Sequence, residues 1–351
     1  MLAVRRGSSG SGLTAGMTSP VIDAHSHYVP RGWPDLAEAV GGTDWPSLRV
    51  DSATEATIMI GSSEFRRIGD ACWNAERRLA DMDDDGVDIQ VVSPTPVFFS
   101  YGRSAQQAAE VSSIFNDLAL EITGHDPARL VPFCQVPLQD AEAACRELDR
   151  CVANGHRGVE IGNHFGDTDL DGGGIVEFLT HCAQSGVPVF VHPWDMPTSP
   201  RLDRWMAQWL VGMPAETHLS LLALILSGAF DRLPASLRIA FAHGGGSFAF
   251  WLGRADNAWH QRHDVVAGGS SRPPSEYIGR FSVDSVVFSE ASLRLLVDVL
   301  GPESVLMGSD YPYPLGERPA GAVVRNSSLE RQDIAPILGA NAARFIGMSE
   351  A

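Results

Sequence analysis

From Val21 onward, short apolar runs alternate along the chain with longer segments of helical pattern. The apolar runs cover residues 21–27, 87–94, 130–138, 158–164, 187–194, 237–245, 281–288 and 305–312. Most of them are rich in Val and Ile and continuously apolar, which is typical of parallel strands buried on both faces. Helical patterns fill the gaps, for example at 105–123 and 140–155. This alternation predicts an α/β fold, a (β/α)8 TIM barrel.

The spacing of the runs also predicts how the chain is divided. Residues 28–86 are more than one helix requires, so we expect a small insertion after the first strand, at about residues 31–70. Residues 1–19 are rich in Gly and Ser and show no periodicity, and we interpret them as a disordered leader. Residues 20–348 are then predicted to form a single barrel domain.

Charge and composition exclude several classes of function. The chain of 351 residues carries 43 acidic and 26 basic side chains, a net charge of −17, and an acidic chain repels nucleic acid. All of the basic residues are Arg, and there is no Lys. This excludes Schiff-base and pyridoxal phosphate chemistry on a lysine, a P-loop lysine and a binuclear metal site bridged by a carbamylated lysine.

The cysteines and the apolar segments indicate a cytoplasmic protein. Five cysteines, an odd number without CxxC spacing, are interpreted as reduced thiols. The most apolar stretch, residues 219–226, is shorter than the roughly 20 residues that span a bilayer. No apolar segment follows Arg5 and Arg6, so no export signal is expected, and neither a membrane nor a nucleic acid is predicted as a partner.

Histidine and aspartate side chains gather at the predicted strand ends, which is where a barrel carries its chemistry. The first strand ends in His25 and His27, the fifth in His192, and the eighth in Asp310. Residues two apart on a strand point the same way, so both imidazoles of the first strand can reach one point. Three His and one Asp suit a single borderline ion such as Zn²⁺. The alternative is that each is a hydrogen-bonded polar residue at a strand end.

The remaining histidines differ in position. His243 ends the sixth strand, before three glycines, and a histidine beside the metal could act as a base. His164 ends the fourth strand and either lines the pocket or supports it from behind. The other six lie in helical or loop patterns, where surface or structural roles are expected.

The sequence around these residues resembles the metal-dependent decarboxylases of the amidohydrolase superfamily. Longer strings resemble the branch of that family that acts on 2-amino-3-carboxymuconate 6-semialdehyde, an intermediate of kynurenine and nitrobenzoate catabolism. The resemblance covers residues 20 to 348. The strings that carry it are DAHSH (23–27), FVHPWDM (190–196), WLVGMPAET (209–217), AHGGGSFAF (242–250), RPPSEY (272–277) and GSDYPYPLGE (308–317).

The resemblance implies a zinc-dependent, non-oxidative decarboxylation, with one Zn²⁺ per chain and no organic cofactor. It implies that His243 is the catalytic residue. It also implies a small anionic dicarboxylate substrate and a homodimer. The metal ligands that it implies are His25, His27, His192 and Asp310.

For the substrate, the resemblance implies two arginines and one aromatic wall. Arg66 and Trp209 correspond to substrate-binding residues, and Arg254 to a residue inserted from the neighbouring subunit. A dianion needs bidentate partners, which guanidinium groups supply. By position alone, the two arginines could equally form surface salt bridges, and Trp209 could be a core residue.

The chain also departs from the family pattern, and other functions stay open. Tyr313 stands where the family usually has Phe, and residues 41–60 follow the pattern loosely. The first alternative is decarboxylation of a related hydroxybenzoate-type acid. The others are a mononuclear zinc hydrolase of a lactone or amide, and a zinc protein without catalytic activity.

Overall fold

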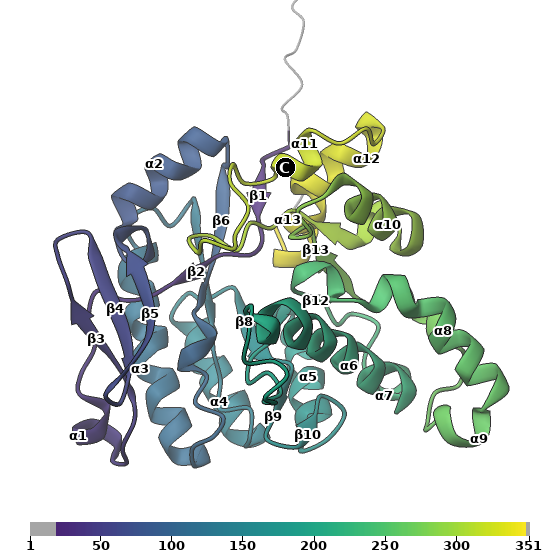
Figure 1. Ribbon diagram of the computed structural model, residues 1–351, viewed down its shortest axis with the longest axis horizontal. Helices are drawn as coiled ribbons and strands as arrows, with labels where there is room; N and C mark the ends of the chain where they lie inside the picture. Colours follow the sequence, from purple (N-terminus) through teal and green to yellow (C-terminus); the bar gives the residue numbers. More distant parts are fainter. Residues whose placement is uncertain (1–18, 349–351) are drawn as a thin grey trace, which may run out of the picture.

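Eight parallel strands form a nearly closed barrel with helices around it, in a computed structural model that describes residues 19–348 (Figure 1). The predicted (β/α)8 fold is confirmed. The first strand is split into β1 (Ile22–Asp23) and β2 (His27–Tyr28). The others, in spatial order, are β6 (Ile89–Pro94), β7 (Leu130–Cys134), β8 (Gly158–Gly162), β11 (Val189–His192), β12 (Ile239–Phe241), β13 (Ser282–Asp284) and β14 (Val305–Leu306). Of the predicted leader, only Ser19 lies within the described residues.

The last strand meets the first through backbone hydrogen bonds beyond β14. The Ala24 N–H donates to the Met307 carbonyl over 2.9 Å, and the His27 N–H donates to the Tyr311 carbonyl over 2.7 Å. On the other side, both β1 and β2 pair with β6. The predicted strand 21–27 therefore appears as two short pieces of one barrel strand.

Helices cover the outside of the barrel, and side-chain caps fix where several of them begin. The larger ones are α2 (Ala75–Asp85), α3 (Ala105–Thr123), α4 (Ala141–Ala153), α5 (Ile175–Gln184), α6 (Met213–Leu226), α8 (Phe248–Gln261), α10 (Glu290–Leu300) and α13 (Asn341–Ile346). Asn74, Ser104, Asp140 and Ser289 each accept a backbone N–H three residues ahead. Such N-caps satisfy donors that the first turn leaves free.

Shorter elements fill the connections. The short α-helices are α1 (Leu36–Val40), α7 (Ala229–Arg232), α9 (His263–Val266), α11 (Ala322–Arg325) and α12 (Arg331–Ala335), and a β-hairpin joins β9 (His164–Phe165) to β10 (Thr168–Asp169). The remaining helical turns are η1 (Asp70–Cys72), η2 (Pro96–Phe98), η3 (Gln208–Gly212), η4 (His243–Gly245), η5 (Pro274–Tyr277), η6 (Pro302–Ser304) and η7 (Pro336–Ala340).

A three-stranded antiparallel sheet follows the first barrel strand. It consists of β3 (Pro46–Val50), β4 (Glu55–Ile60) and β5 (Ser63–Gly69). Ala56, Ile58 and Ile68 are buried in a cluster that also contains Phe98 and Tyr313. This packing holds the sheet against the end of the barrel where the strands finish, so residues of β5 can reach a site there.

Apolar side chains fill the barrel interior, as in other (β/α)8 barrels. Ile22, Val91, Phe133, Phe190 and Leu306 belong to one buried cluster. Phe133 of β7 lies over Gly158 of β8, where an added Cβ would come within 2.2 Å of the phenyl ring. The interior is therefore a packed core, and chemistry is confined to the strand ends.

One helical run of the described chain, Gln208–Leu226, has the length and apolar composition of a membrane span. It is longer than the predicted apolar stretch 219–226 because η3 and α6 join into one run. Leu221, Leu224 and Ile225 within it are fully buried in the main core of the barrel. These contacts are those of a core helix of a globular domain.

Candidate metal centre

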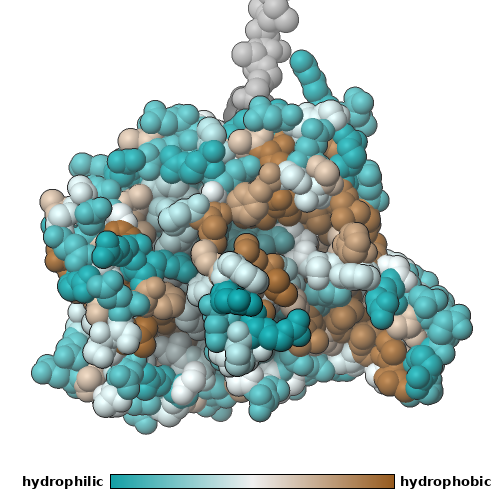
Figure 2. Space-filling view, in the orientation of Figure 1, coloured by the Kyte–Doolittle hydropathy of each residue, from teal (hydrophilic) through white to brown (hydrophobic). Residues whose placement is uncertain are grey.

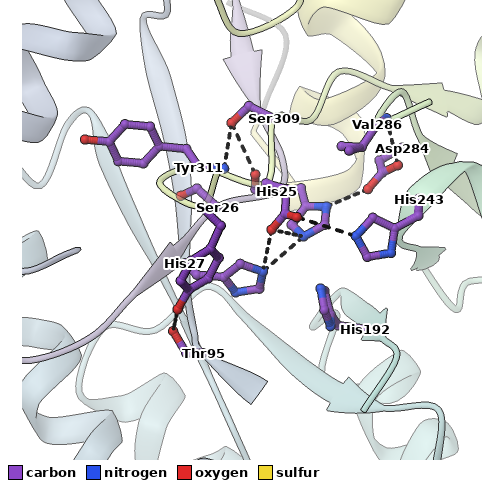
Figure 3. A network of polar contacts seen from close by, with 12 residues as sticks. His25, Ser26, His27, Thr95, His192, His243, Asp284, Val286, Ser309 and Tyr311 are labelled. Carbon is purple, nitrogen blue, oxygen red and sulfur yellow. Dashed lines mark hydrogen bonds and ion pairs between the residues drawn. The ribbon is translucent and has the colours of Figure 1, made fainter. Parts of the chain in front are cut away.

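Four side chains converge at the carboxyl ends of the barrel strands: His25, His27, His192 and Asp310. Figure 3 shows the three histidines of this group facing one another. One possible ligand atom from each lies within 4.8 Å of the others. The two Nε2 atoms of His25 and His27 are 3.1 Å apart, and Oδ1 of Asp310 lies 3.6 and 3.3 Å from them. The His192 ring completes the group, with its centroid 4.8 Å from that of His27.

Hydrogen bonds on the far side of each imidazole fix its orientation. Nδ1 of His27 lies 3.2 Å from the Pro94 carbonyl, and Nδ1 of His192 lies 3.0 Å from the Pro193 carbonyl. Carbonyl oxygens only accept, so these Nδ1 atoms carry the protons. The Nε2 lone pairs are then free and face the centre of the group, as metal ligation requires.

The charge balance of the buried group fits a cation. The carboxylates of Asp284 and Glu160 are fully buried beside the histidines, and neither oxygen of Glu160 has a hydrogen-bond partner among the described residues. Burial raises the pKa of Glu160 to about 7. Burial and the neighbouring imidazoles hold the pKa of His192 well below its usual value, so this ring is neutral at pH 7. A neutral His192 beside the carboxylates of Asp284 and Asp310 leaves negative charge that a divalent ion would compensate.

Asp310 is suited to remain ionised in this group. Burial alone would raise its pKa, but the neighbouring His243 and His27 imidazoles outweigh burial and hold the pKa well below the usual range. Three imidazole nitrogens and one carboxylate oxygen form a donor set typical of Zn²⁺ and related borderline ions. The residues therefore fit a mononuclear metal centre.

His243 lies against this group but on its own turn. It begins η4 with a φ of +55°, and the three following glycines also have positive φ. An added Cβ at Gly246 would come within 2.2 Å of the Pro214 carbonyl oxygen, so the turn requires glycine there. Nε2 of His243 lies 3.7 Å from Oδ2 of Asp310. Burial lowers the pKa of His243, but Asp310 and Asp284 outweigh burial and raise the pKa, which favours a ring that can hold a proton.

Arg66 reaches the group through Tyr313. Its guanidinium carbon lies 4.6 Å from the centroid of the Tyr313 ring, and that ring lies 5.7 Å from the His27 ring. The Tyr313 hydroxyl is held 2.5 Å from Oγ1 of Thr95. Among residues 19–348, no carboxylate lies within 4.0 Å of the Arg66 guanidinium. The cation is thus positioned on an aromatic ring and free to bind an anion.

The other predicted site residues do not join this network. Arg254 is exposed on α8, and its guanidinium carbon lies 5.9 Å from the Trp251 ring of its own helix. Trp209 lies half-buried in η3. His164 is in the β9 hairpin, where Nδ1 lies 2.8 Å from the Gly166 carbonyl and Nε2 lies 3.7 Å from Glu216. Within one chain, the structure brings together His243, Arg66 and the four metal-binding side chains.

Sequence reasoning missed two buried carboxylates beside the centre. Asp284 ends β13 and lies 2.6 Å from Nδ1 of His25, and Glu160 of β8 lies 3.9 Å from Nδ1 of His27. Both are charged residues inside otherwise apolar strand segments, FSVDSVVF and GVEIGNH. A charged residue that is buried in a strand needs a partner. A single acidic residue within an apolar strand segment could therefore have identified both Asp284 and Glu160 from the sequence.

Comparison with known proteins agrees with the geometry. The sequence profile of the amidohydrolase family matches residues 22–348. A 2-amino-3-carboxymuconate-6-semialdehyde decarboxylase of Dictyostelium discoideum is 37% identical over 93% of this chain and 91% of its own length. One from Caenorhabditis elegans is 30% identical over 96% and 97%. The structure of a dihydroxybenzoic acid decarboxylase from a Polaromonas species, with bound manganese and 2-nitroresorcinol, superimposes with a TM-score of 0.74 at 20% identity, covering 95% of this chain and 98% of that one.

Proposed function

Because this chain belongs to the amidohydrolase family, we propose that it is a metal-dependent decarboxylase that converts 2-amino-3-carboxymuconate 6-semialdehyde to 2-aminomuconate 6-semialdehyde. The observation that carries the proposal is the buried set of His25, His27, His192 and Asp310 with His243 beside it. The two relatives named for this reaction cover nearly the whole chain and support the choice of substrate.

In the proposed reaction, each of these residues has a separate task. His25, His27, His192 and Asp310 hold one Zn²⁺, which supplies a Lewis acid and a bound water of lowered pKa when present. Loss of CO2 leaves an electron pair on the substrate carbon, so a proton must be delivered there. His243 takes a proton from water and delivers it to that carbon, and its position against the metal-binding group, 3.7 Å from Asp310, suits this task. No organic cofactor is required.

Arg66 is proposed to bind one substrate carboxylate. A guanidinium group donates two parallel N–H bonds, which match the two oxygens of a carboxylate. The Tyr313 ring beneath Arg66 keeps that group at a fixed place beside the metal centre. We propose Trp209 as an aromatic wall of the same pocket.

We also propose that the active form is a homodimer, with Arg254 supplied to the partner's site. Large apolar side chains are exposed before and within η3, on α6, and on α8, the helix that carries Arg254, and apolar surface gathers on this side of the molecule (Figure 2). Exposed patches of this kind are typical of subunit interfaces. The residues are Trp205, Met206, Leu210, Val211, Leu219, Phe250 and Trp251.

The five cysteines are free, which supports the proposed cytoplasmic location.

A second candidate function is decarboxylation of a hydroxybenzoate-type acid. The observation that favours it is the hydroxyl of Tyr313, held beside the centre by Thr95, because this group could bind a phenolic substrate. The fold of the Polaromonas enzyme is compatible with it. Zinc-dependent hydrolysis of a lactone or amide uses the same kind of ligand set.

Product analysis separates these candidates. The zinc-loaded protein is incubated with 2-amino-3-carboxymuconate 6-semialdehyde, with 2,6-dihydroxybenzoate, and with a lactone and an amide of similar size. The proposal predicts loss of the muconate absorbance with one CO2 released per molecule consumed, at a kcat/KM well above that for dihydroxybenzoate. Preference for dihydroxybenzoate would establish the second candidate. Incorporation of water without CO2 would show a hydrolase.

A further inference from the structure

The carboxylate of Asp284 touches both the candidate metal centre and the turn that carries His243 (Figure 3). It is fully buried at the end of β13. One oxygen, Oδ2, lies 2.6 Å from Nδ1 of His25. The other, Oδ1, accepts the backbone N–H groups of Gly244 and Val286 over 2.9 and 3.0 Å. The two oxygens therefore face two different parts of the site.

The contact with His25 determines which nitrogen of that ring can bind a metal. An ionised carboxylate only accepts, so Nδ1 of His25 carries the proton and Nε2 keeps its lone pair. Nε2 is the atom that faces His27 and Asp310. His27 and His192 have neutral carbonyl acceptors at the same place, so His25 alone of the three has a charged hydrogen-bond partner at Nδ1.

The contact with Gly244 holds the turn that positions His243. Gly244 follows His243 directly, and both residues have left-handed backbone conformations. Such a conformation persists for a non-glycine residue only when its surroundings hold it. The carboxylate of Asp284 supplies a charged acceptor for the backbone of this turn. The N–H of Val286 donates to the same carboxylate oxygen and holds it in place.

We infer that Asp284 is a positioning residue that couples metal binding by His25 to the placement of His243. The inference rests on the proposed function, because it assumes a metal at the four ligands and a proton carrier at His243. Its two effects are separable by variant. Asp284→Asn keeps an oxygen for Gly244 and Val286 but turns an NH2 donor toward the Nδ1 proton of His25. Asp284→Ala removes both contacts.

The first test measures metal binding without substrate. The holoprotein competes for Zn²⁺ with a chelator of known affinity. Loss of a carboxylate behind a metal-binding histidine typically costs 10- to 100-fold in affinity, so both variants should have a raised Kd by about this factor. Glu160→Gln is the matched control, because it removes another buried carboxylate near His27 that makes no hydrogen bond with a metal-binding side chain. Its Kd should change much less.

The second test measures turnover at saturating Zn²⁺. Asp284→Asn should regain most of its kcat, whereas Asp284→Ala should remain at least tenfold lower because His243 is displaced. This extra loss should disappear when His243→Ala is the parent, as expected for two residues that act through one step. The KM should change little in either variant.

The results that overturn the inference are distinct for each arm. An unchanged Zn²⁺ affinity in Asp284→Asn, or an equal loss in Glu160→Gln, removes the role toward His25. Equal kcat values for the Asn and Ala variants at saturating Zn²⁺ remove the role toward His243. If the protein does not turn over the proposed substrate, the Zn²⁺ affinities can still be measured. Failure of the proposed function is therefore distinguishable from failure of this inference. If Asp284→Ala does not fold, nitrogen NMR of the zinc-loaded native protein still decides whether Nδ1 of His25 is protonated.

Discussion

Oδ2 of Asp310 faces Nε2 of His243 at 3.7 Å, while Oδ1 of the same carboxylate faces Nε2 of His27 at 3.3 Å. One side chain therefore stands between the candidate metal ligands and the candidate proton carrier. Metal binding and proton transfer can therefore be separated by mutation. His243 lies beside the metal-binding group but is not one of its four ligand side chains.

The four ligands should be individually required for metal retention. We predict that His192→Ala loses most of its bound metal, because it removes one of the four side chains that enclose the ion. Elemental analysis of the purified variant measures this directly. His125→Ala, which changes an exposed histidine before β7, should retain about one ion per chain. Full metal content in His192→Ala would exclude it as a ligand.

His243 should behave differently from the ligands. We predict that His243→Ala retains near-normal metal but loses activity by about 10²- to 10⁴-fold, the usual effect of removing a general base or acid. Metal content and turnover are measured on the same sample. A variant that loses its metal would show that His243 is a ligand instead.

Arg66 should contribute to substrate binding and not to the metal. Arg66→Ala removes charge-assisted hydrogen bonds to a carboxylate, so kcat/KM should fall about 10- to 100-fold with unchanged metal content. Arg67→Ala is the matched control, since Arg67 is an exposed neighbour on the same strand. Tyr313→Phe keeps the ring under Arg66 and should retain most of the activity on the muconate substrate. An equal fall in kcat/KM in the two arginine variants would show that the substitutions disturb the structure of β5, and that the effect is not the loss of a substrate contact.

A shared site should be revealed by mixing two inactive chains. His243→Ala and Arg254→Ala are each expected to be inactive alone. If Arg254 acts in the partner's site, a mixed dimer has one site with both changes and one with neither, so activity should return in part. Subunit exchange must be shown independently, for example by mass spectrometry of tagged chains. Exchange without recovered activity would mean that Arg254 acts in its own chain or not at all.

The sequence predicted the parts of this structure that repeat. Apolar runs at regular spacing gave the barrel strands, and His25, His27, His192 and Asp310 were assigned to strand ends that meet in space. Strand limits were less accurate. The run 281–288 was expected to be one strand, but β13 ends at Asp284, where the carboxylate turns to His25 and the backbone leaves the sheet.

What the sequence could not supply were contacts between distant residues. The stacking of Arg66 on Tyr313 joins β5 to the loop after β14, and no local pattern indicates that pair. The buried pairs of Asp284 with His25 and of Glu160 with His27 depend equally on closure of the barrel. A charged residue in an apolar strand indicates that a partner exists but does not identify it.

The most direct test of the account is a metal titration of CO2 release. Metal-free protein receives increasing Zn²⁺, and CO2 formed from 2-amino-3-carboxymuconate 6-semialdehyde is measured at each step. The account predicts no release without metal, a linear rise, and a break at one ion per chain, with no comparable rise for His243→Ala. A break at two ions per chain, or CO2 release that does not depend on metal, would contradict it.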